Sequence, residues 1–312
     1  MNKLLLYLSV FATTFVYADV EDNVKLISVQ KDTTQFTFVG TPDLFPEQWD
    51  TLAQPNFWKI IMKMSPDSCL LNVAHTRQIL RKESVKNWNK LSNSQKELAR
   101  TELKRIYKLD SNARIFMTTG KSDFFQFNHV YPSISKAVEI FSKNETDPWY
   151  AQAILMIESP GKIAYSNVGA YGPFQLMKSV ARHHGLRVDK YVDERKDFDK
   201  SAYGSAHLLR TSCIPEAKRI MKKFNITVTK SMEYSLWFRL LVLHNYHAGA
   251  GNVEKVLTNV VRPNCGCKDI ITTIWRSEYG SFKNASQNYS QLALASLLVL
   301  DDFIATECEL VE

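Results

Sequence analysis

"DPWYAQAILMIESPG", residues 147–161, is the stretch of sequence that decides the fold. Asp147 is a favourable N-cap, and Pro148 suits the first helical position because a backbone N–H there would have no helical partner. The apolar residues that follow cover nearly the whole circumference of the helix, so we expect it to be buried inside a domain. Pro160 and Gly161 end the helix directly after Glu158.

Glu158 is an acidic residue at the end of this otherwise apolar helix. Burial and the negative end of the helix dipole both disfavour its charged form, so both raise its pKa. A Glu that stays protonated near neutral pH can donate a proton to a leaving group, which is the role of a general acid. The alternative is a Glu that turns into solvent or pairs with a basic residue, and this stretch alone does not decide between the two.

Two later segments have the composition of a sugar-binding cleft. "SNVGAYGPFQLM" (residues 166–177) contains two glycines, aromatic residues and Gln175, and "LHNYHAGAGNV" (residues 243–253) places Tyr246 before a small-residue turn. Glycines let the backbone approach a ligand closely, whereas aromatic rings and Gln suit stacking on a sugar and hydrogen bonding to it.

These segments resemble the three motifs of soluble-lytic-transglycosylase-type (SLT) catalytic domains: "ES" at 158–159, "GAYGPFQLM" at 169–177 and "NYHAGAGNV" at 245–253. Between them, "HGLRVDKYVDERKD" is similar to the linking segment of membrane-bound lytic transglycosylase D-type enzymes, with matching residues at Tyr191, Asp193, Arg195 and Asp197. The resemblance covers about residues 125–260. It implies a mainly α fold class, with a lysozyme-like (goose-type) catalytic domain and an N-terminal mixed α/β extension.

Carried over by position, the resemblance implies that Glu158 is the catalytic acid. It also implies that substrate is contacted by Ser166, Gly172, Gln175, Tyr246 and His247. The chain departs from the family pattern in two places. The stretch from Glu158 to Gly172 is one residue shorter than usual, and His247 stands where the family usually has Asn.

The reaction expected here needs only one carboxyl group. Glycoside cleavage by the usual routes needs two carboxylates, but no Asp or Glu occurs from Ser159 to Val188. The resemblance implies that Glu158 protonates the bond between N-acetylmuramic acid and N-acetylglucosamine in peptidoglycan. Glu158 then removes the proton of the muramyl C6 hydroxyl as a 1,6-anhydro ring closes, without a metal or a cofactor.

Two other functions stay open at this point. One is a lysozyme-type hydrolase, in which Asp189 or Asp193 reaches the cleft as the second carboxylate. The other is a non-catalytic glycan-binding protein on the same fold.

The histidines of the same half of the chain, His183, His184, His244 and His247, invite a metal-site interpretation. However, "HNYH" lacks the Glu of a zinc-protease helix, and its histidines are spaced i, i+3 rather than i, i+4. The adjacent His183 and His184 point to different sides of any helix. We therefore expect structural or substrate-contacting histidines and no metal.

The ends of the chain predict export and a soluble mature protein. Residues 1–18 combine Lys3, an apolar run and Ala18 at a cleavage position, which predicts a signal peptide and a periplasmic or extracellular location. No later segment reads as long and apolar enough to span a bilayer, so we expect no stable membrane insertion. Residues 263–312 are expected to form a C-terminal helical extension that packs on the catalytic domain, assigned to residues 125–262.

Residues 19–124 form an N-terminal region of unknown role. Residues 24–40 predict a β-hairpin, and residues 41–49 predict an extended connection with two prolines. The pattern turns helical from Asn56 onward, and Ser94 and Glu97 have the spacing of a capping box. Residues 113–125 predict a short strand and turn.

The net charge of +7, or +6 without Lys3, favours anionic partners such as cell-wall polymers. Lys and Arg are spread along the chain rather than clustered, and no nucleic-acid-binding motif is present. The expected partner is therefore the peptidoglycan glycan strand, with no nucleic acid, and no protein partner is predicted.

Five cysteines, Cys69, Cys213, Cys265, Cys267 and Cys308, allow up to two disulfides outside the cytoplasm. "CGC" at 265–267 has no second Cys or His pair at zinc-like spacing around it. Disulfide-bonded or unpaired structural thiols are favoured over a metal site, and the pairing stays open.

Overall fold

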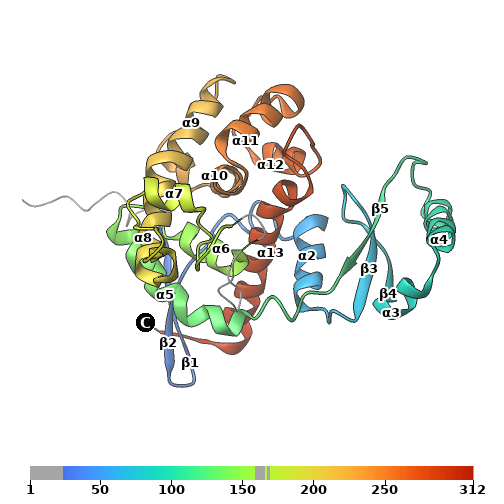
Figure 1. The fold of residues 1–312 in the computed structure, drawn as a ribbon, viewed down its shortest axis with the longest axis horizontal. Coiled ribbons are helices and arrows are strands. Elements are labelled where there is room, and N and C mark those ends of the chain that lie inside the picture. Colours follow the sequence, from blue (N-terminus) through green and yellow to red (C-terminus); the bar gives the residue numbers. More distant parts are fainter. Residues whose placement is uncertain (1–23, 159–165, 167–168, 312) are drawn as a thin grey trace, which may run out of the picture.

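The computed structural model describes residues 24–158, 166 and 169–311 (Figure 1). The predicted signal peptide, together with the predicted helix stop at Pro160 and Gly161, lies outside these residues. Helices dominate the described chain, and strands are confined to two small three-stranded sheets near its N-terminal end. The predicted mainly α class with an N-terminal mixed α/β region is thus confirmed.

The first sheet is the predicted hairpin extended by the C-terminus of the chain. Strands β1 (Leu26–Lys31) and β2 (Thr34–Val39) pair antiparallel, and β6 (Glu309–Leu310) adds to the free edge of β1. Residues 41–49 fold as a series of turns, so the predicted extended connection is wrong. The turns are closed by backbone hydrogen bonds such as Leu44 N to Thr41 O, 3.1 Å.

The hairpin is fastened to the helices that follow much later in the chain. The Gln152 side chain accepts from Val39 N and donates to Val39 O, at 2.9 and 3.0 Å. Trp149 Nε1 donates to Thr41 Oγ1 at 2.9 Å, and Leu236 N donates to Asp43 Oδ2 at 3.0 Å. The N-terminal residues up to the first helix therefore belong to the main body of the molecule.

Residues 66–120 form a lobe that projects from one side of the body (Figure 1). Helix α2 (Ala53–Lys63) leads into it, and the lobe contains β3 (Ser68–Val73), β4 (Ile79–Ser84), α3 (Val85–Lys90), α4 (Asn93–Ile106) and β5 (Ile115–Thr119). The strand order is β4-β3-β5. Because β3 and β4 are strands, the prediction of helix from Asn56 onward is wrong for this segment. The strand predicted within residues 113–125 is confirmed as β5.

Successive side chains of β3 point to opposite faces of the sheet, and those on one face give the lobe a core of its own. Cys69, Leu71 and Val73 pack with Trp88 and Leu103 on the side of α3 and α4, while Leu70 joins the core of the main body. Helix α4 is capped by Ser92, whose hydroxyl accepts from Gln95 N, and Gln95 bonds back to Ser92 N. The capping box thus lies at Ser92 and Gln95, not at Ser94 and Glu97.

The lobe joins the body at a narrow neck and at a buried arginine. The chain enters the lobe near Ser65 and leaves it at Gly120, and a Cβ on Gly120 would lie 2.2 Å from the Ser65 carbonyl oxygen. This close approach of the two segments requires glycine. Arg77 donates to Asn72 Oδ1 and to Asn288 Oδ1 at 3.2 and 2.7 Å. Because Asn288 belongs to the last helix, this contact fixes the lobe to the body.

The decisive helix is α6 (Trp149–Glu158), every residue of which is buried except Glu158, which is partly exposed. Asp147 Oδ1 accepts from Trp149 N at 3.0 Å, as expected of an N-cap. Asp147 Oδ2 also accepts from Arg239 Nε at 2.8 Å in a buried ion pair. The predicted buried helix is confirmed, and its start is held by a cation as well as by backbone hydrogen bonds.

Further helices enclose α6. Helix α5 (Phe127–Lys143), which contains Pro132, packs on α6. The others are α7 (Lys178–His183), α8 (Phe198–Leu208), α9 (Ile214–Lys222), α10 (Leu236–Ala248), α11 (Ala250–Val256), α12 (Lys268–Ile274) and α13 (Asn284–Glu307), joined by single-turn segments η1 (Glu194–Lys196), η2 (Leu209–Cys213), η3 (Ser231–Tyr234) and η4 (Leu257–Val261).

Helix α13 is the central helix of the body and packs on α2, α6 and α10. Among the described residues it alone is long and apolar enough to cross a membrane by length and composition, with a mean hydropathy of 1.2. The prediction that no later segment reaches this threshold is therefore wrong. However, 67% of its apolar window is buried inside the protein, as in the core helix of a globular domain.

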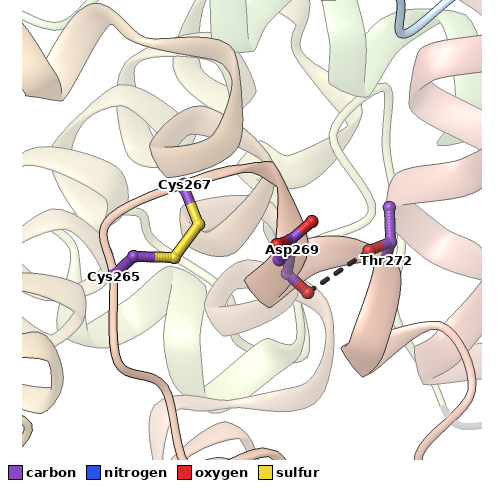
Figure 2. The surroundings of a disulfide bond; sticks show 4 residues. All are labelled: Cys265, Cys267, Asp269 and Thr272. Carbon is purple, nitrogen blue, oxygen red and sulfur yellow. Dashed lines mark hydrogen bonds between the residues drawn. A yellow bond between two sulfur atoms is a disulfide. The ribbon is translucent and has the colours of Figure 1, made fainter.

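Cys265 and Cys267 form a disulfide in the loop before α12 (Figure 2). This pair answers the open question about "CGC". The other three cysteines are free thiols; Cys69 and Cys213 are buried and Cys308 is partly exposed.

Candidate active site

A pocket of about 370 Å³ opens beside the C-terminal end of α6. Its walls come from the loop before α7, from α7 itself, from η2 and α9, and from the end of α10. The pocket contains five of the six residues predicted for the site, namely Glu158, Ser166, Gln175, Tyr246 and His247. Their sequence positions span all three motifs, and the fold brings them to one cavity.

Glu158 has the electrostatic environment expected of a general acid. Burial raises the pKa of its carboxyl group to about 7, and a hydrogen bond from Tyr289 opposes part of this shift. The Tyr289 hydroxyl is itself buried beside Glu158 and meets no other hydrogen-bond partner in the described part of the chain. A raised pKa keeps Glu158 protonated near neutral pH.

Tyr289 reaches the site from α13, outside all three sequence motifs. Its ring stacks on His247 of α10, with centroids 4.3 Å apart and planes 13° from parallel. His247 lines the pocket, and burial lowers its pKa, which favours the neutral imidazole. The His that replaces the usual Asn therefore forms part of an aromatic wall next to Glu158.

Ser166 and Gln175 come from the loop between α6 and α7. The Ser166 hydroxyl accepts from Ala170 N at 2.9 Å, so it shapes the loop as well as lining the pocket. Gln175 adopts a positive φ of 48°, and its amide Nε2 donates to Gly172 O at 3.0 Å. Both side chains are thus oriented by the loop backbone toward the pocket.

Gly172 is the one predicted substrate residue that does not line the pocket. Its φ is 86°, and a Cβ there would lie 1.9 Å from the Arg195 carbonyl oxygen. The close approach that glycine permits is therefore to the backbone of this protein rather than to a ligand. Gly172 thus has a packing role in the loop, and its predicted contact with substrate stays a prediction.

Tyr246 lines the pocket through its ring, while its hydroxyl is held by the protein. The hydroxyl donates to Phe174 O at 2.6 Å and contacts Ser205 Oγ at 3.2 Å. Burial and the nearby Glu158 raise its pKa. Tyr246 therefore stays neutral and ties α10 to the loop that carries Gln175.

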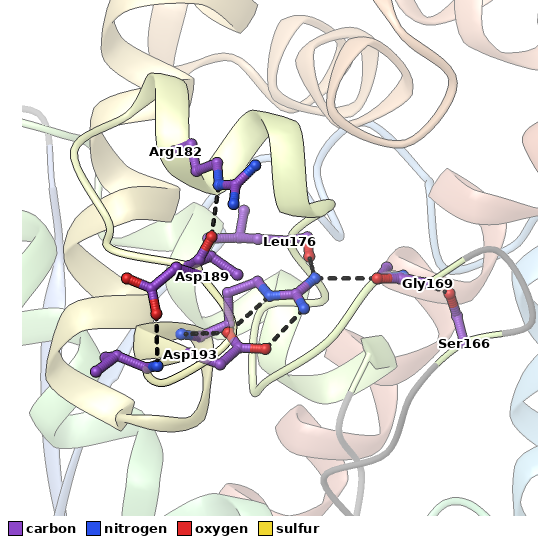
Figure 3. A network of polar contacts seen from close by, with 10 residues as sticks. Ser166, Gly169, Leu176, Arg182, Asp189 and Asp193 are labelled. Carbon is purple, nitrogen blue, oxygen red and sulfur yellow. Dashed lines mark hydrogen bonds and ion pairs between the residues drawn. The ribbon is translucent and has the colours of Figure 1, made fainter.

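Arg195 anchors this loop through its backbone, and Figure 3 shows how Gly169, Leu176 and Asp193 lie in the network that it forms. Its guanidinium forms an ion pair with Asp193 at 2.8 Å and donates to the carbonyl oxygens of Gly169 and Leu176, both at 3.0 Å. Asp197 of the same segment caps α8 by accepting from Lys200 N at 2.9 Å. Tyr191, by contrast, is 77% exposed. The linking segment thus supports the loop without entering the pocket.

The two aspartates considered as a second carboxylate are occupied elsewhere. Arg187 and two backbone N–H groups lower the pKa of Asp189 to about 2, and Arg195 lowers the pKa of Asp193. Neither lines the pocket. The alternative in which one of them serves as the second carboxylate therefore has no support from this structure.

Glu216 is the second carboxylate that does line the pocket, and sequence reasoning missed it. It lies in the first turn of α9, and its Oε2 accepts two hydrogen bonds from Arg219 at 2.9 and 2.8 Å. Arg219 also pairs with Glu254 at 2.6 Å. Glu216 is thus held in an ion-pair network at the pocket wall.

Asn245 and Cys213 also line the pocket without having been predicted. Asn245 Nδ2 donates to Cys213 O at 3.1 Å, whereas its Oδ1 is buried without a hydrogen-bond partner in the described chain. The position of Asn245 in the third motif was the available signal. Burial raises the pKa of Cys213 to about 12, so its thiol stays protonated.

The remaining histidines contact each other or the core. His184 Nδ1 lies 3.0 Å from His207 Nδ1, and the rings of His183 and His184 meet edge to face. His244 Nε2 bonds to Ser290 Oγ at 2.7 Å, and burial lowers its pKa to about 3. Within the described ranges, no group of three or more His, Cys, Asp or Glu side chains is arranged to hold a metal ion.

Residues 137–264 match the family model described as the transglycosylase SLT domain. This part of the chain, which is fewer than half of its residues, is similar to that family, whose fold is lysozyme-like. A comparison with curated proteins found no match. The domain supports a function of the lytic transglycosylase type that acts on peptidoglycan. The predicted limits of 125–262 and the predicted residue roles stay predictions.

Proposed function

We propose that this protein is an exported lytic transglycosylase that cleaves the MurNAc-β-1,4-GlcNAc bond of peptidoglycan and leaves 1,6-anhydro-MurNAc ends. The observation that carries the proposal is Glu158, whose pKa is raised to about 7 at the wall of a pocket within an SLT domain. Export rests on residues 1–18, and the disulfide between Cys265 and Cys267 supports an oxidising compartment.

In the first step, the Glu158 carboxyl donates its proton to the glycosidic oxygen while the bond from that oxygen to the muramyl C1 breaks. The GlcNAc end leaves with a hydroxyl group, and positive charge develops at C1. The N-acetyl group of the substrate stabilises that charge, so no carboxylate nucleophile is required. Glu158 is then a carboxylate, which its hydrogen bond from Tyr289 favours.

In the second step, the Glu158 carboxylate removes the proton of the muramyl C6 hydroxyl as O6 bonds to C1. The 1,6-anhydro ring closes, Glu158 regains its proton, and no water is consumed. One residue thus serves as acid and then as base, which a pKa near the working pH makes efficient. Stacking of Tyr289 on His247 holds one wall of the pocket rigid during both steps.

A lysozyme-type hydrolase is the second candidate, and Glu216 is the observation that favours it. A hydrolase needs a second carboxylate to activate water or to act as nucleophile. Glu216 accepts two hydrogen bonds from Arg219 and is thus held in an ion pair within the protein rather than free to act on water or substrate. We therefore rank this function second.

Activity should fall as the pH rises through about 7. The pKa of Glu158 in the folded protein is raised above its ordinary value of 4.5, so the protonated acid is present below about pH 7 and lost above it. The measurement is kcat/KM on soluble glycan strands from pH 5 to 9. An alkaline limb centred near the ordinary Glu pKa would contradict this assignment.

Tyr289→Phe should move that alkaline limb to higher pH. The variant keeps the aromatic stack on His247 but removes the hydroxyl that lowers the pKa of Glu158. The same pH series on this variant provides the test, with Tyr279→Phe, an exposed tyrosine, as the control. A limb that stays in place or moves to lower pH would show that the hydroxyl does not lower the pKa of Glu158.

The function as a whole is tested by incubating the mature protein, and Glu158→Gln in parallel, with purified peptidoglycan. We expect the wild type to release soluble muropeptides and the variant to release none above background. Equal release by both proteins would remove Glu158 from the mechanism. If neither releases products but both bind the glycan, the non-catalytic binding protein becomes the better description.

A further inference from the structure

The positive charge of this protein is concentrated in the lobe of residues 66–120. The lobe contains eleven Lys and Arg against five Asp and Glu, a net charge of +6, whereas the rest of the chain has 28 against 27. The expectation that basic residues are scattered is therefore wrong for the folded molecule. Almost the whole net charge of +7 lies on a projection outside the SLT domain (Figure 1).

The arginines of the lobe are already engaged. Arg77 is buried against amide oxygens. The other four are each in an ion pair, namely Arg81 with Glu83, Arg100 with Glu97, Arg105 with Glu102 and Arg114 with Glu278.

The lysines differ, because several have no ion-pair partner in the described part of the chain. Among these are Lys82 on β4 and Lys86 and Lys90 on α3, all exposed, which we call the basic edge. Strand β4 runs directly into α3, and Lys86 and Lys90 lie one helical turn apart.

Lys82 also lines an open groove of about 480 Å³ between α2 and the lobe. Lys59 and Lys63 of α2 form the facing wall, and apolar side chains at Ile60, Met64 and Leu70 lie between the two walls. Asp302 pairs with Lys59 and Lys63 at 2.9 and 2.8 Å, with Asp301 beside it. Among the described residues, Lys82 is therefore the cation of this groove left for a ligand.

We propose that the basic edge and this groove bind the stem peptides of peptidoglycan, short chains that carry carboxylates and small alkyl side chains. The inference rests on the proposed function, since it names a second contact for the same substrate. Ammonium groups attract carboxylates, and the apolar floor suits the alkyl groups. A phosphate polymer would be better served by free arginine forks, which the lobe does not offer.

The test measures binding of catalytically silent proteins to insoluble peptidoglycan by co-sedimentation. The parent carries Glu158→Gln, so that no strand is cut during the assay. One variant adds Lys82→Glu, Lys86→Glu and Lys90→Glu to the parent. The matched control adds Lys222→Glu, Lys230→Glu and Lys283→Glu, which are equally exposed and change the net charge equally, but lie outside the lobe. Thermal unfolding midpoints establish that all three proteins fold.

The basic-edge variant should bind about tenfold more weakly than the parent at low salt, and this difference should shrink as salt is raised. The control variant should bind like the parent. An excess of free stem peptides in solution should compete for the basic edge and abolish the difference, whereas acid removal of phosphate polymers from the peptidoglycan should leave it unchanged.

Equal weakening in both variants would overturn the proposal, as would a difference that survives an excess of free stem peptides or that disappears with the phosphate polymers. Failure of the parent to bind at all would overturn it too. Wild-type protein digests the same preparations in parallel, so a failure of the proposed function appears there as absent products and is distinguishable from a failure of binding.

Discussion

Glu158→Gln is expected to remove peptidoglycan cleavage, with a loss of at least about 10²- to 10⁴-fold, because a single residue supplies both proton transfers. Gln keeps the shape of the side chain but can neither donate the proton to the leaving group nor accept one from the C6 hydroxyl. The measurement is the initial rate of soluble product release. Stability serves as the folding check.

The stability of Glu158→Gln relative to the wild type depends on pH. The folded state holds the Glu158 proton more tightly than the unfolded state, so the wild type loses stability as the pH rises through about 7. Gln does not ionise, and the variant should unfold at no lower temperature than the wild type at pH 8.

Glu216→Gln is the matched comparison, because it alters the other carboxylate of the same pocket. The single-acid mechanism predicts that this variant retains most of the activity. A loss as deep as that of Glu158→Gln would instead indicate a two-carboxylate hydrolase.

The second large effect concerns the buried ion pair that anchors α6. Asp147→Ala should lower the free energy of unfolding by about 3–5 kcal/mol, because it leaves the Arg239 guanidinium buried without its carboxylate. This is a large share of a net stability of about 5–15 kcal/mol. Urea unfolding followed by circular dichroism measures the change.

Two further variants show whether the cause is the unpaired charge. Glu139→Ala breaks an exposed pair with Lys143 on α5 and should cost less than about 1 kcal/mol. In the double variant Asp147→Ala, Arg239→Met, no charge is left buried, so part of the lost stability should return. If the double variant is less stable than Asp147→Ala alone, the loss arises from the missing helix cap instead.

The parts of the fold that could be predicted are those with a local signal. Helix α6 was predictable because its N-cap and its uniformly apolar composition lie within one short segment. Strand β3 was missed because "SCLLNV" is a short, nearly continuous apolar run, and such a run does not distinguish a buried strand from a helix. Its side chains alternate between the core of the lobe and the core of the main body, and this alternation is apparent only in the folded structure.

The site divides in the same way. The motifs located Glu158, Ser166, Gln175, Tyr246 and His247, all of which line the pocket. Tyr289 was not predictable, because α13 is brought to Glu158 by tertiary packing and the sequence around it reads as ordinary core. The glycine pattern at Gly172 indicates a close approach but not which group approaches, and the structure places the Arg195 backbone there. The net charge of the lobe could likewise be counted only once the structure had defined residues 66–120 as a unit.

The central claim is that Glu158 acts without a second carboxylate and without water. The most direct test is digestion of peptidoglycan by the wild type in water enriched in oxygen-18, with mass spectrometry of the muramyl ends. We predict products lighter by one water than reducing ends, in which the muramyl end has gained no heavy oxygen. Reducing muramyl ends that contain oxygen-18 would contradict the account and direct attention to Glu216 as the residue that activates water.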